Sequence, residues 1–122
     1  DAGSVKIKGR MKDVVIRGGE NLFPKEIEDL LYTHPDISDV QVIGLPDPRY
    51  GEELCACIIL HEHHQTSEQA IREYCAEHIS HNKVPRYVRF FNAFPMTASR
   101  KKQKFKLQEF MREELNLAPD PV

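Results

Sequence analysis

Two stretches of the sequence carry residue types whose spacing could support chemistry at a bound ligand. In the first, Gly18 and Gly19 lie between the β-branched run 14–16 and Pro24. β-branched residues favour a strand, adjacent glycines allow a positive φ or the close approach of another molecule, and proline suits the first turn of a helix. The spacing therefore predicts a strand, a glycine turn that could face a ligand, and a helix.

The second stretch is a basic run near the other end of the chain. Cations stabilise negative charge that develops in a transition state, and they also contact phosphates. From the residues alone, such a run is most often a solvated surface. The alternative is a nucleic-acid-binding surface on which Phe105 stacks against a base. The basic residues of the run are Arg100, Lys101, Lys102, Lys104 and Lys106.

The cysteines and histidines give a weak signal for a metal or redox site. Cys55 and Cys57 share one face of a strand, but positions i and i+2 do not give good disulfide geometry. His61, His63 and His64 lie in a polar stretch without the spacing of a zinc site. We therefore expect no metal site, and free thiols in a reducing, intracellular compartment.

The bulk composition limits the classes of function. A formal charge of −2, with 30% charged residues, argues against a protein that binds polyanions with its whole surface. No apolar run approaches the roughly 18 residues that a membrane span needs, and we expect neither a transmembrane segment nor a signal peptide. A chain of 122 residues predicts one domain, residues 1–122.

Hydrophobic periodicity predicts an α+β domain that positions both stretches. A small N-terminal two-stranded hairpin is expected over residues 4–17, followed by a helix from Pro24 to Thr33. Thr66 with Gln69 forms a capping-box pattern before the second of about three helices. The other expected elements are the strands 40–44, 54–60 and 87–91 of a roughly three-stranded sheet, the helices around 71–79 and 107–115, and loops at 45–51, 61–65 and 92–104.

Two blocks of the sequence resemble the C-terminal domain of the adenylate-forming enzymes, the superfamily of acyl-CoA synthetases, luciferases and peptide-synthetase adenylation domains. The first block comprises Gly9-Arg10-x-Lys12-Asp13, Gly18-Gly19-Glu20-Asn21, Pro24 and Glu26-Ile27-Glu28. The second, residues 95–101, is similar to the lysine loop of that family, and residues 81–88 are similar to a block of the fatty-acyl-type synthetases. The resemblance covers nearly the whole chain.

The resemblance implies three roles around the nucleotide. Lys101 would be the catalytic lysine of adenylation, a cation placed between the substrate carboxylate and the α-phosphate of ATP. Arg10 would help to hold the nucleotide, because a guanidinium suits bidentate recognition of oxygen atoms. Lys12 would be the hinge, near residues 10–13, about which the domain rotates between adenylation and thioester formation.

The resemblance also implies a second site on the same domain. Gly18, Gly19 and Glu20 would face the pantetheine arm of CoA after rotation, since glycines let the backbone come close to a thin ligand. Asn21 is expected to cap the helix that follows.

The sequence departs from the family pattern beside the lysine. The family usually has a glycine before this lysine and an apolar residue after it, whereas Arg100 and Lys102 occupy those places here. If the glycine position requires a positive φ, an arginine there costs roughly 1 kcal/mol or more.

The function that the resemblance implies is that of a mobile C-terminal domain in an ATP-dependent fatty acyl-CoA synthetase. The enzyme would convert acid, ATP with Mg²⁺, and CoA into acyl-CoA, AMP and pyrophosphate, in the cytoplasm or the mitochondrial matrix. The partners would be a large N-terminal domain of the same protein and a fatty acid, without nucleic acid, and the domain by itself is expected to be inactive. The alternatives are a nucleic-acid-binding module that uses residues 100–106, and a protein-interaction domain that has lost catalysis.

Overall fold

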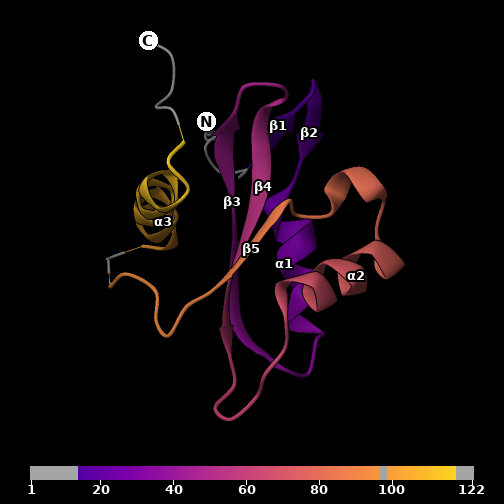
Figure 1. The fold of residues 1–122 in the computed structure, drawn as a ribbon, viewed down its shortest axis with the longest axis vertical. Coiled ribbons are helices and arrows are strands. Elements are labelled where there is room, and N and C mark those ends of the chain that lie inside the picture. The colour runs from indigo at the N-terminus through magenta and orange to yellow at the C-terminus, as the bar shows by residue number, and fades with distance from the viewer. Residues whose placement is uncertain (1–13, 97–98, 118–122) are drawn as a thin grey trace, which may run out of the picture.

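A computed structural model describes residues 14–96 and 99–117 of the chain. Within these ranges the fold is α+β, as the periodicity predicts, with a two-stranded sheet, a three-stranded sheet and helices on both faces of the larger sheet (Figure 1). In chain order the elements are β1 (Val15–Arg17), β2 (Glu20–Leu22), α1 (Pro24–Tyr32), β3 (Ile37–Asp47), β4 (Gly51–Leu60), α2 (Glu68–His78), the 3₁₀ helix η2 (His81–Lys83), β5 (Tyr87–Phe90) and α3 (Arg100–Glu114).

The central strand of the larger sheet is β4. It pairs antiparallel with β3 and parallel with β5, so the strand order is β3-β4-β5. A strand that is covered on both faces reads as a continuous apolar run rather than an alternating one. The prediction of a central strand near residues 54–60, made from the apolar run, is therefore confirmed.

Two hydrophobic clusters lie on opposite faces of this sheet. Alternation along β3 and β4 sends Val42 and Ala56 into one cluster, with α1, α2 and the β1–β2 hairpin, and sends Ile43 and Cys55 into the other, with α3. Figure 1 shows the same layers, with α3 on one side of the sheet and α1 and α2 on the other.

The β3–β4 connection is shorter than the predicted loop 45–51. β3 continues through Asp47, and the turn occupies only residues 48–50. Asp47 Oδ2 accepts hydrogen bonds from the backbone N–H groups of Arg49 (3.0 Å) and Tyr50 (2.8 Å), which builds a tight turn. The prediction is wrong at Pro46, whose residue type is typical of a loop. Proline is also tolerated in a strand at the edge of a sheet, and β3 is an edge strand.

The glycines close a hairpin instead of leading from a strand directly into a helix. β1 pairs antiparallel with β2, and the turn between them has Gly18 at φ +58° and Gly19 at φ +86°. A two-residue turn with both φ values positive matches the right-handed twist of the flanking strands. The sequence predicts that β1 pairs with an earlier strand of a hairpin over residues 4–17. That earlier segment lies before residue 14, outside the described residues.

Two predicted helix caps are wrong. Asn21 is part of β2, and α1 follows Phe23 with Pro24 in its first turn and without a side-chain cap. At α2 the cap is Ser67 rather than Thr66, and Ser67 Oγ accepts a hydrogen bond from Ala70 N (3.0 Å).

Helix α3 is longer than predicted. It begins at Arg100 rather than near Leu107, and Ser99 Oγ accepts from Lys102 N at 3.2 Å as the N-cap contact. The buried residues of α3 are Leu107 and Met111. The first two turns therefore lack a fully buried apolar residue. Their many charged residues are typical of a loop, which is why the sequence predicts a loop there.

We expect Leu107→Ala to destabilise the chain by about 2–5 kcal/mol, because it opens a cavity where α3 packs on the sheet. Leu107 is 1% exposed, whereas Phe105 on the same helix is 71% exposed. The matched control Phe105→Ala should change the free energy of unfolding by about 0.5 kcal/mol or less. Urea unfolding of both variants measures the difference, and equal effects would contradict the packing of α3.

Candidate functional site

Lys101 lies in the first turn of α3, with its side chain exposed to solvent. It is therefore part of a helix and not of the predicted loop 92–104. The first turn of α3 contains no acidic residue. Cations near the positive end of a helix dipole are unfavourable, so this turn favours the approach of an anion.

Arg100 fits its position without backbone strain. Among the described residues, the non-glycine residues with a positive φ are His63 and Asn116, and Arg100 is helical. The strain expected for an arginine with a positive φ at this position is therefore absent. Arg100 Nη2 instead donates a hydrogen bond to the Val40 carbonyl at 2.8 Å.

Two cations near Lys101 in the helix, Arg100 and Lys104, contact Glu28 of α1. Arg100 Nη2 lies 3.8 Å from Glu28 Oε1, and Lys104 Nζ lies 2.8 Å from Glu28 Oε2. Glu28 is only 7% exposed, and its Oε2 also accepts a hydrogen bond from Val42 N at 2.9 Å. Arg100, although its side chain is 47% exposed, and Lys104 thus reach the edge strand β3 and Glu28, while Lys101 is exposed.

The surroundings of Arg100 keep it charged. Partial burial by itself lowers the pKa of Arg100, whereas the hydrogen bond with Tyr32 and the charge of Glu28 raise it, and the net direction is upward. Burial, followed by the hydrogen bond to Asp39, raises the pKa of Tyr32.

The glycine turn of the hairpin is attached to the protein on two sides. Gly18 N donates to the Tyr50 carbonyl at 2.8 Å, and Glu20 Oε1 accepts from Asn82 Nδ2 at 2.6 Å. A Cβ on Gly18 would lie 3.3 Å from the Tyr50 ring, whereas one on Gly19 would meet nothing within 4 Å. The backbone at Gly19 is therefore the open point of the turn.

Arg17 fastens the hairpin to the β3–β4 turn. Its Nε donates to Glu53 Oε1 at 2.8 Å, and its guanidinium carbon lies 4.0 Å from the centre of the Tyr50 ring. Glu52 Oε1 accepts from Ile16 N at 2.7 Å. Sequence reasoning missed these contacts, although a charged Glu53 beside the apolar run of β4 is a signal for a buried ion pair.

The two predicted sites lie on opposite sides of the larger sheet. The hairpin residues Val15 and Leu22 belong to the cluster beneath α1 and α2, while α3, which carries Lys101, packs on the other face (Figure 1). The structure therefore does not bring Lys101 together with Gly18, Gly19 and Glu20. Arg10 and Lys12 lie outside the described residues.

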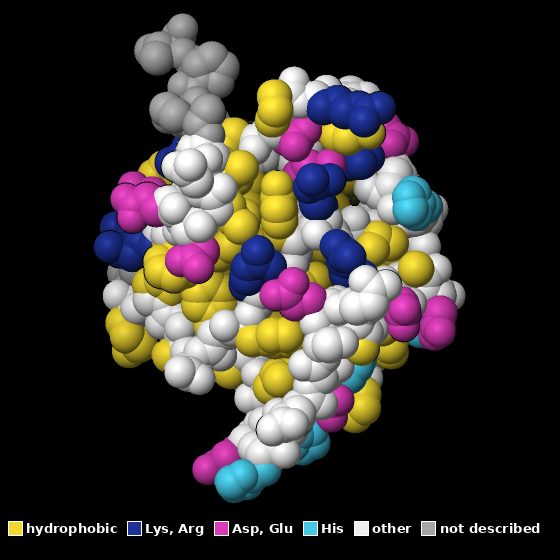
Figure 2. Space-filling view, in the orientation of Figure 1, with side chains coloured by type: hydrophobic (Ala, Val, Ile, Leu, Met, Phe, Trp, Pro, Cys, Tyr) yellow, Lys and Arg dark blue, Asp and Glu magenta, His cyan; other side chains and the backbone are white. Residues whose placement is uncertain are grey.

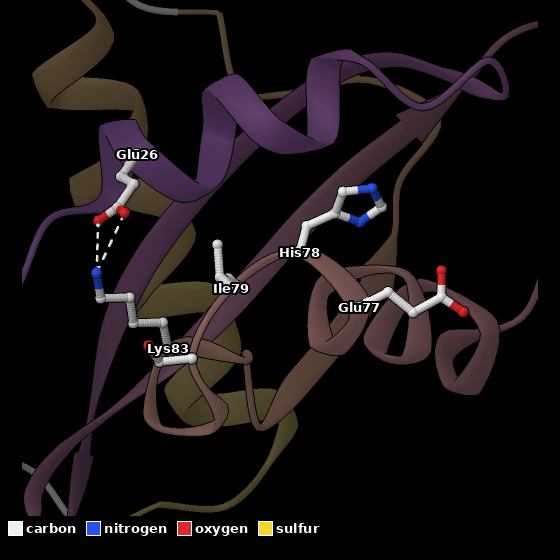
Figure 3. Close-up of a pocket in the computed structure, with 6 residues that line it drawn as sticks. Glu26, Glu77, His78, Ile79 and Lys83 are labelled. Carbon is white, nitrogen blue, oxygen red and sulfur yellow. Dashed lines mark hydrogen bonds and ion pairs between the residues drawn. The ribbon is translucent and has the colours of Figure 1, made fainter.

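A shallow hollow of about 420 Å³ opens between the start of α1 and the end of α2 (Figure 3). Lys83 points at Glu26 across it, with its Nζ 3.1 Å from Glu26 Oε2. His78 Nδ1 donates to the Tyr74 carbonyl at 2.8 Å. Among the described residues, none of either predicted site lines the hollow, whose lining comprises Glu26, Glu77, His78, Ile79, Ser80 and Lys83.

The thiols and histidines do not form a cluster with metal-binding geometry. Within residues 14–96 and 99–117, no group of three or more His, Cys, Asp or Glu side chains could hold a metal ion. All three cysteines are free and buried. His64 Nδ1 lies 2.8 Å from Asp36 Oδ1. Likewise, no helix of the described part of the chain has the length and apolar character to cross a membrane.

We expect Arg17→Met to destabilise the chain by about 3–5 kcal/mol, because it leaves Glu53, only 2% exposed, as a buried charge without this partner. The matched control is Lys25→Met, which breaks an exposed pair with Asp29 and should cost about 0.5 kcal/mol or less. Denaturant unfolding of both variants is the measurement, and similar effects would rule out a structural role for the Arg17 pair.

The buried thiol of Cys75 should react slowly in the folded chain. Burial raises the pKa of Cys75 to about 11, so roughly one thiol in a thousand is ionised at pH 8. Labelling with a disulfide reagent at pH 8 should be slow in buffer and fast in urea, and the rate in buffer should rise as pH approaches 11. Rapid labelling of the folded chain would contradict this burial.

Comparison with known proteins identifies the family of the chain. The pattern of the family described as the AMP-binding enzyme C-terminal domain matches residues 26–101. The mitochondrial medium-chain acyl-CoA ligase ACSF2 of Bos taurus is 51% identical over 117 residues, which is 96% of this chain and 19% of that protein. The putative acyl-CoA synthetase YngI of Bacillus subtilis is 49% identical over 95% of this chain and 21% of its own length.

Solved structures share the fold. Apo MatB from Rhodopseudomonas palustris has a TM-score of 0.79 and 31% identity, over 87% of this chain and 21% of that one. A fatty acyl CoA synthetase of Mycobacterium tuberculosis has a TM-score of 0.70 and 34% identity, over 80% of this chain and 20% of that one. The chain thus spans about a fifth of the length of these relatives. Because the family pattern covers more than half of the chain, the chain belongs to the AMP-binding enzyme C-terminal domain family.

Proposed function

We propose that this chain is the mobile C-terminal domain, residues 1–122, of an ATP-dependent acyl-CoA synthetase. The full enzyme first joins an acid to AMP with release of pyrophosphate, and then transfers the acyl group to CoA with release of AMP. Support comes from family membership and from relatives named as acyl-CoA ligases, of which this chain spans about a fifth. A large N-terminal domain of the same protein is the partner that completes the active site.

The observation that carries the proposal is the exposed Lys101 in a cationic first helical turn. Adenylation brings two anions together, the carboxylate and the α-phosphate, so a cation held between them stabilises the charge of the transition state. Lys101 takes this role when α3 faces the larger domain. Arg10, outside the described residues, assists in holding the nucleotide.

The glycine turn serves the second half-reaction. After a rotation about Lys12, also outside the described residues, the turn of Gly18, Gly19 and Glu20 faces the pantetheine arm of CoA. Gly19 suits this role because its missing side chain leaves open backbone for a thin ligand. The position of the turn across the sheet from α3 supports the use of two different faces in the two steps.

The substrates follow from the relatives' names and remain part of the proposal. A medium-chain fatty acid is the acid that the ACSF2 proteins suggest, and the word mitochondrial in their names suggests a mitochondrial location, with the cytoplasm as the alternative. ATP-bound MatB is among the similar structures, which supports ATP as the nucleotide. Mg²⁺ is expected to bind together with the phosphates of ATP, mainly on the larger domain.

The nucleic-acid alternative fits the structure less well. Glu28 contacts Arg100 and Lys104, two of the five cations in the run 100–106. In the face that Figure 2 shows, Lys and Arg side chains are interspersed with Asp and Glu rather than gathered into one basic surface. An interaction domain without catalysis is the other alternative, and an assay of Lys101 separates it from the proposal.

In the full-length enzyme that carries this domain, Lys101→Ala should slow ATP–pyrophosphate exchange with a fatty acid by about 10²–10³-fold, since one preorganised charge contact is lost. Thioester formation from supplied acyl-adenylate and CoA should remain within about twofold of wild type.

The matched control is Lys106→Ala, which removes another exposed cation of the same helix and should leave both rates unchanged. Unaltered pyrophosphate exchange in Lys101→Ala would refute the assignment of Lys101.

A further inference from the structure

The first two turns of α3 are held to the sheet mainly by polar contacts. The first buried apolar residue of the helix is Leu107, two turns beyond Arg100. Between them, Phe105 is 71% exposed and gives little packing. The position of Lys101 therefore depends on hydrogen bonds and ion pairs rather than on a hydrophobic contact.

Glu28 is the residue on which these polar contacts converge. It belongs to α1 on the opposite face of the sheet, and its carboxylate reaches the outer edge of β3, where Oε2 accepts from Val42 N at 2.9 Å. From the other face Lys104 Nζ approaches Oε2 at 2.8 Å, and Arg100 approaches Oε1 at 3.8 Å. One carboxylate thus joins both helix layers at the edge of the sheet.

Arg100 adds a second contact at the same edge. Its Nη2 donates to the Val40 carbonyl at 2.8 Å. Val40 lies two residues before Val42, whose N–H donates to Glu28. Further along the helix, Gln103 Oε1 accepts from Gln41 Nε2 at 2.6 Å and Gln108 Nε2 donates to the Gly44 carbonyl at 2.9 Å. Two backbone carbonyls of β3, those of Val40 and Gly44, and the Gln41 side chain thus serve as attachment points for α3.

We propose that Glu28 and Arg100 are positioning residues for adenylation: they hold the first turn of α3 on the edge of β3 so that Lys101 is presented in one orientation. This proposal rests on the proposed function of Lys101. Arg100 immediately precedes Lys101, so its attachment fixes the backbone from which the lysine projects. The arginine at the family's usual glycine position is, in this chain, the anchor of the lysine.

The effect on the reaction follows from geometry. A cation contributes to catalysis only where it meets the developing charge, and a misplacement of about 1 Å costs up to 10²-fold in rate. The glycine turn lies on the other side of the sheet and touches none of these groups. Loosening the first turn of α3 should therefore affect adenylation and spare thioester formation.

The test uses the full-length enzyme and both half-reactions, with Glu28→Gln and Arg100→Gly as variants. Glu28→Gln keeps an oxygen that can accept from Val42 N but removes the charge that holds Arg100 and Lys104. Pyrophosphate exchange should fall about tenfold in each variant, with thioester formation from supplied acyl-adenylate unchanged. Arg100→Lys, which keeps the charge, should recover part of the exchange rate, and Lys106→Gln is the charge-matched control.

The two residues should also act as a unit. Because the two side chains contact each other and hold the same helical turn, the double variant Glu28→Gln with Arg100→Gly should be little slower in exchange than the slower single variant. Thermal unfolding of the same proteins separates positioning from stability, since a general loss of folding slows both half-reactions together.

Each outcome decides the question. Equal slowing of both half-reactions, or wild-type exchange in Glu28→Gln and Arg100→Gly, overturns the positioning proposal. If Lys101→Ala in the same assay retains full exchange, the proposed role of Lys101 fails and the positioning proposal fails with it. Loss of exchange in Lys101→Ala but not in the other two variants leaves the function intact and refutes positioning alone.

Discussion

The buried carboxylate of Glu28 is the constraint on which the arrangement of the helices depends. Taking a carboxylate out of water costs several kcal/mol unless cations and hydrogen-bond donors compensate it. Here the compensation comes from the N–H of Val42 and from Lys104 and Arg100. Those partners belong to the edge strand and to the helix on the far face, so the carboxylate can be satisfied only when both helix layers are assembled. The same contacts cover the edge of β3, which would otherwise present unpaired backbone groups to other chains.

The larger sheet lies between the two candidate sites and fixes their relative positions. β4 is covered on both faces and pairs on both sides, so the sheet between α3 and the β1–β2 hairpin is a packed layer. Close-packed layers deform little, and Lys101 and Gly19 cannot approach one another by a small internal shift. If both serve one active site, as the proposed function requires, the domain has to turn as a body. The Arg17–Glu53 contact supports such movement because it keeps the hairpin attached to the sheet.

Local patterns predict the elements that depend on local signals. The apolar run of β4, Pro24 at the start of α1 and the amphipathic pattern of α2 all agree with the structure. The errors arise where tertiary contacts override local preference, as at Pro46 in the edge strand and in the charged first turns of α3. Lys101 and the glycine turn are recognisable from their resemblance to the family. The contacts of Glu28, which itself belongs to the first family block, and the Arg17–Glu53 pair are not predicted. Glu28 contacts Arg100, and Arg17 and Glu53 lie 36 positions apart, and no local pattern encodes such contacts.

The charge arrangement at the start of α3 is consistent with a helix that is completed by an anion. Cations in the first turn oppose the helix dipole, and a structure selected for stability alone would place acidic residues there. Glu28 relieves the conflict for the half-exposed Arg100 and the more buried Lys104, but it does so from α1 and leaves Lys101 exposed to solvent. The positive end of the helix and the exposed cation therefore act in the same direction, toward whatever faces α3. An anion that approaches this turn would be favoured by both, which is the electrostatic basis for the proposed role of Lys101.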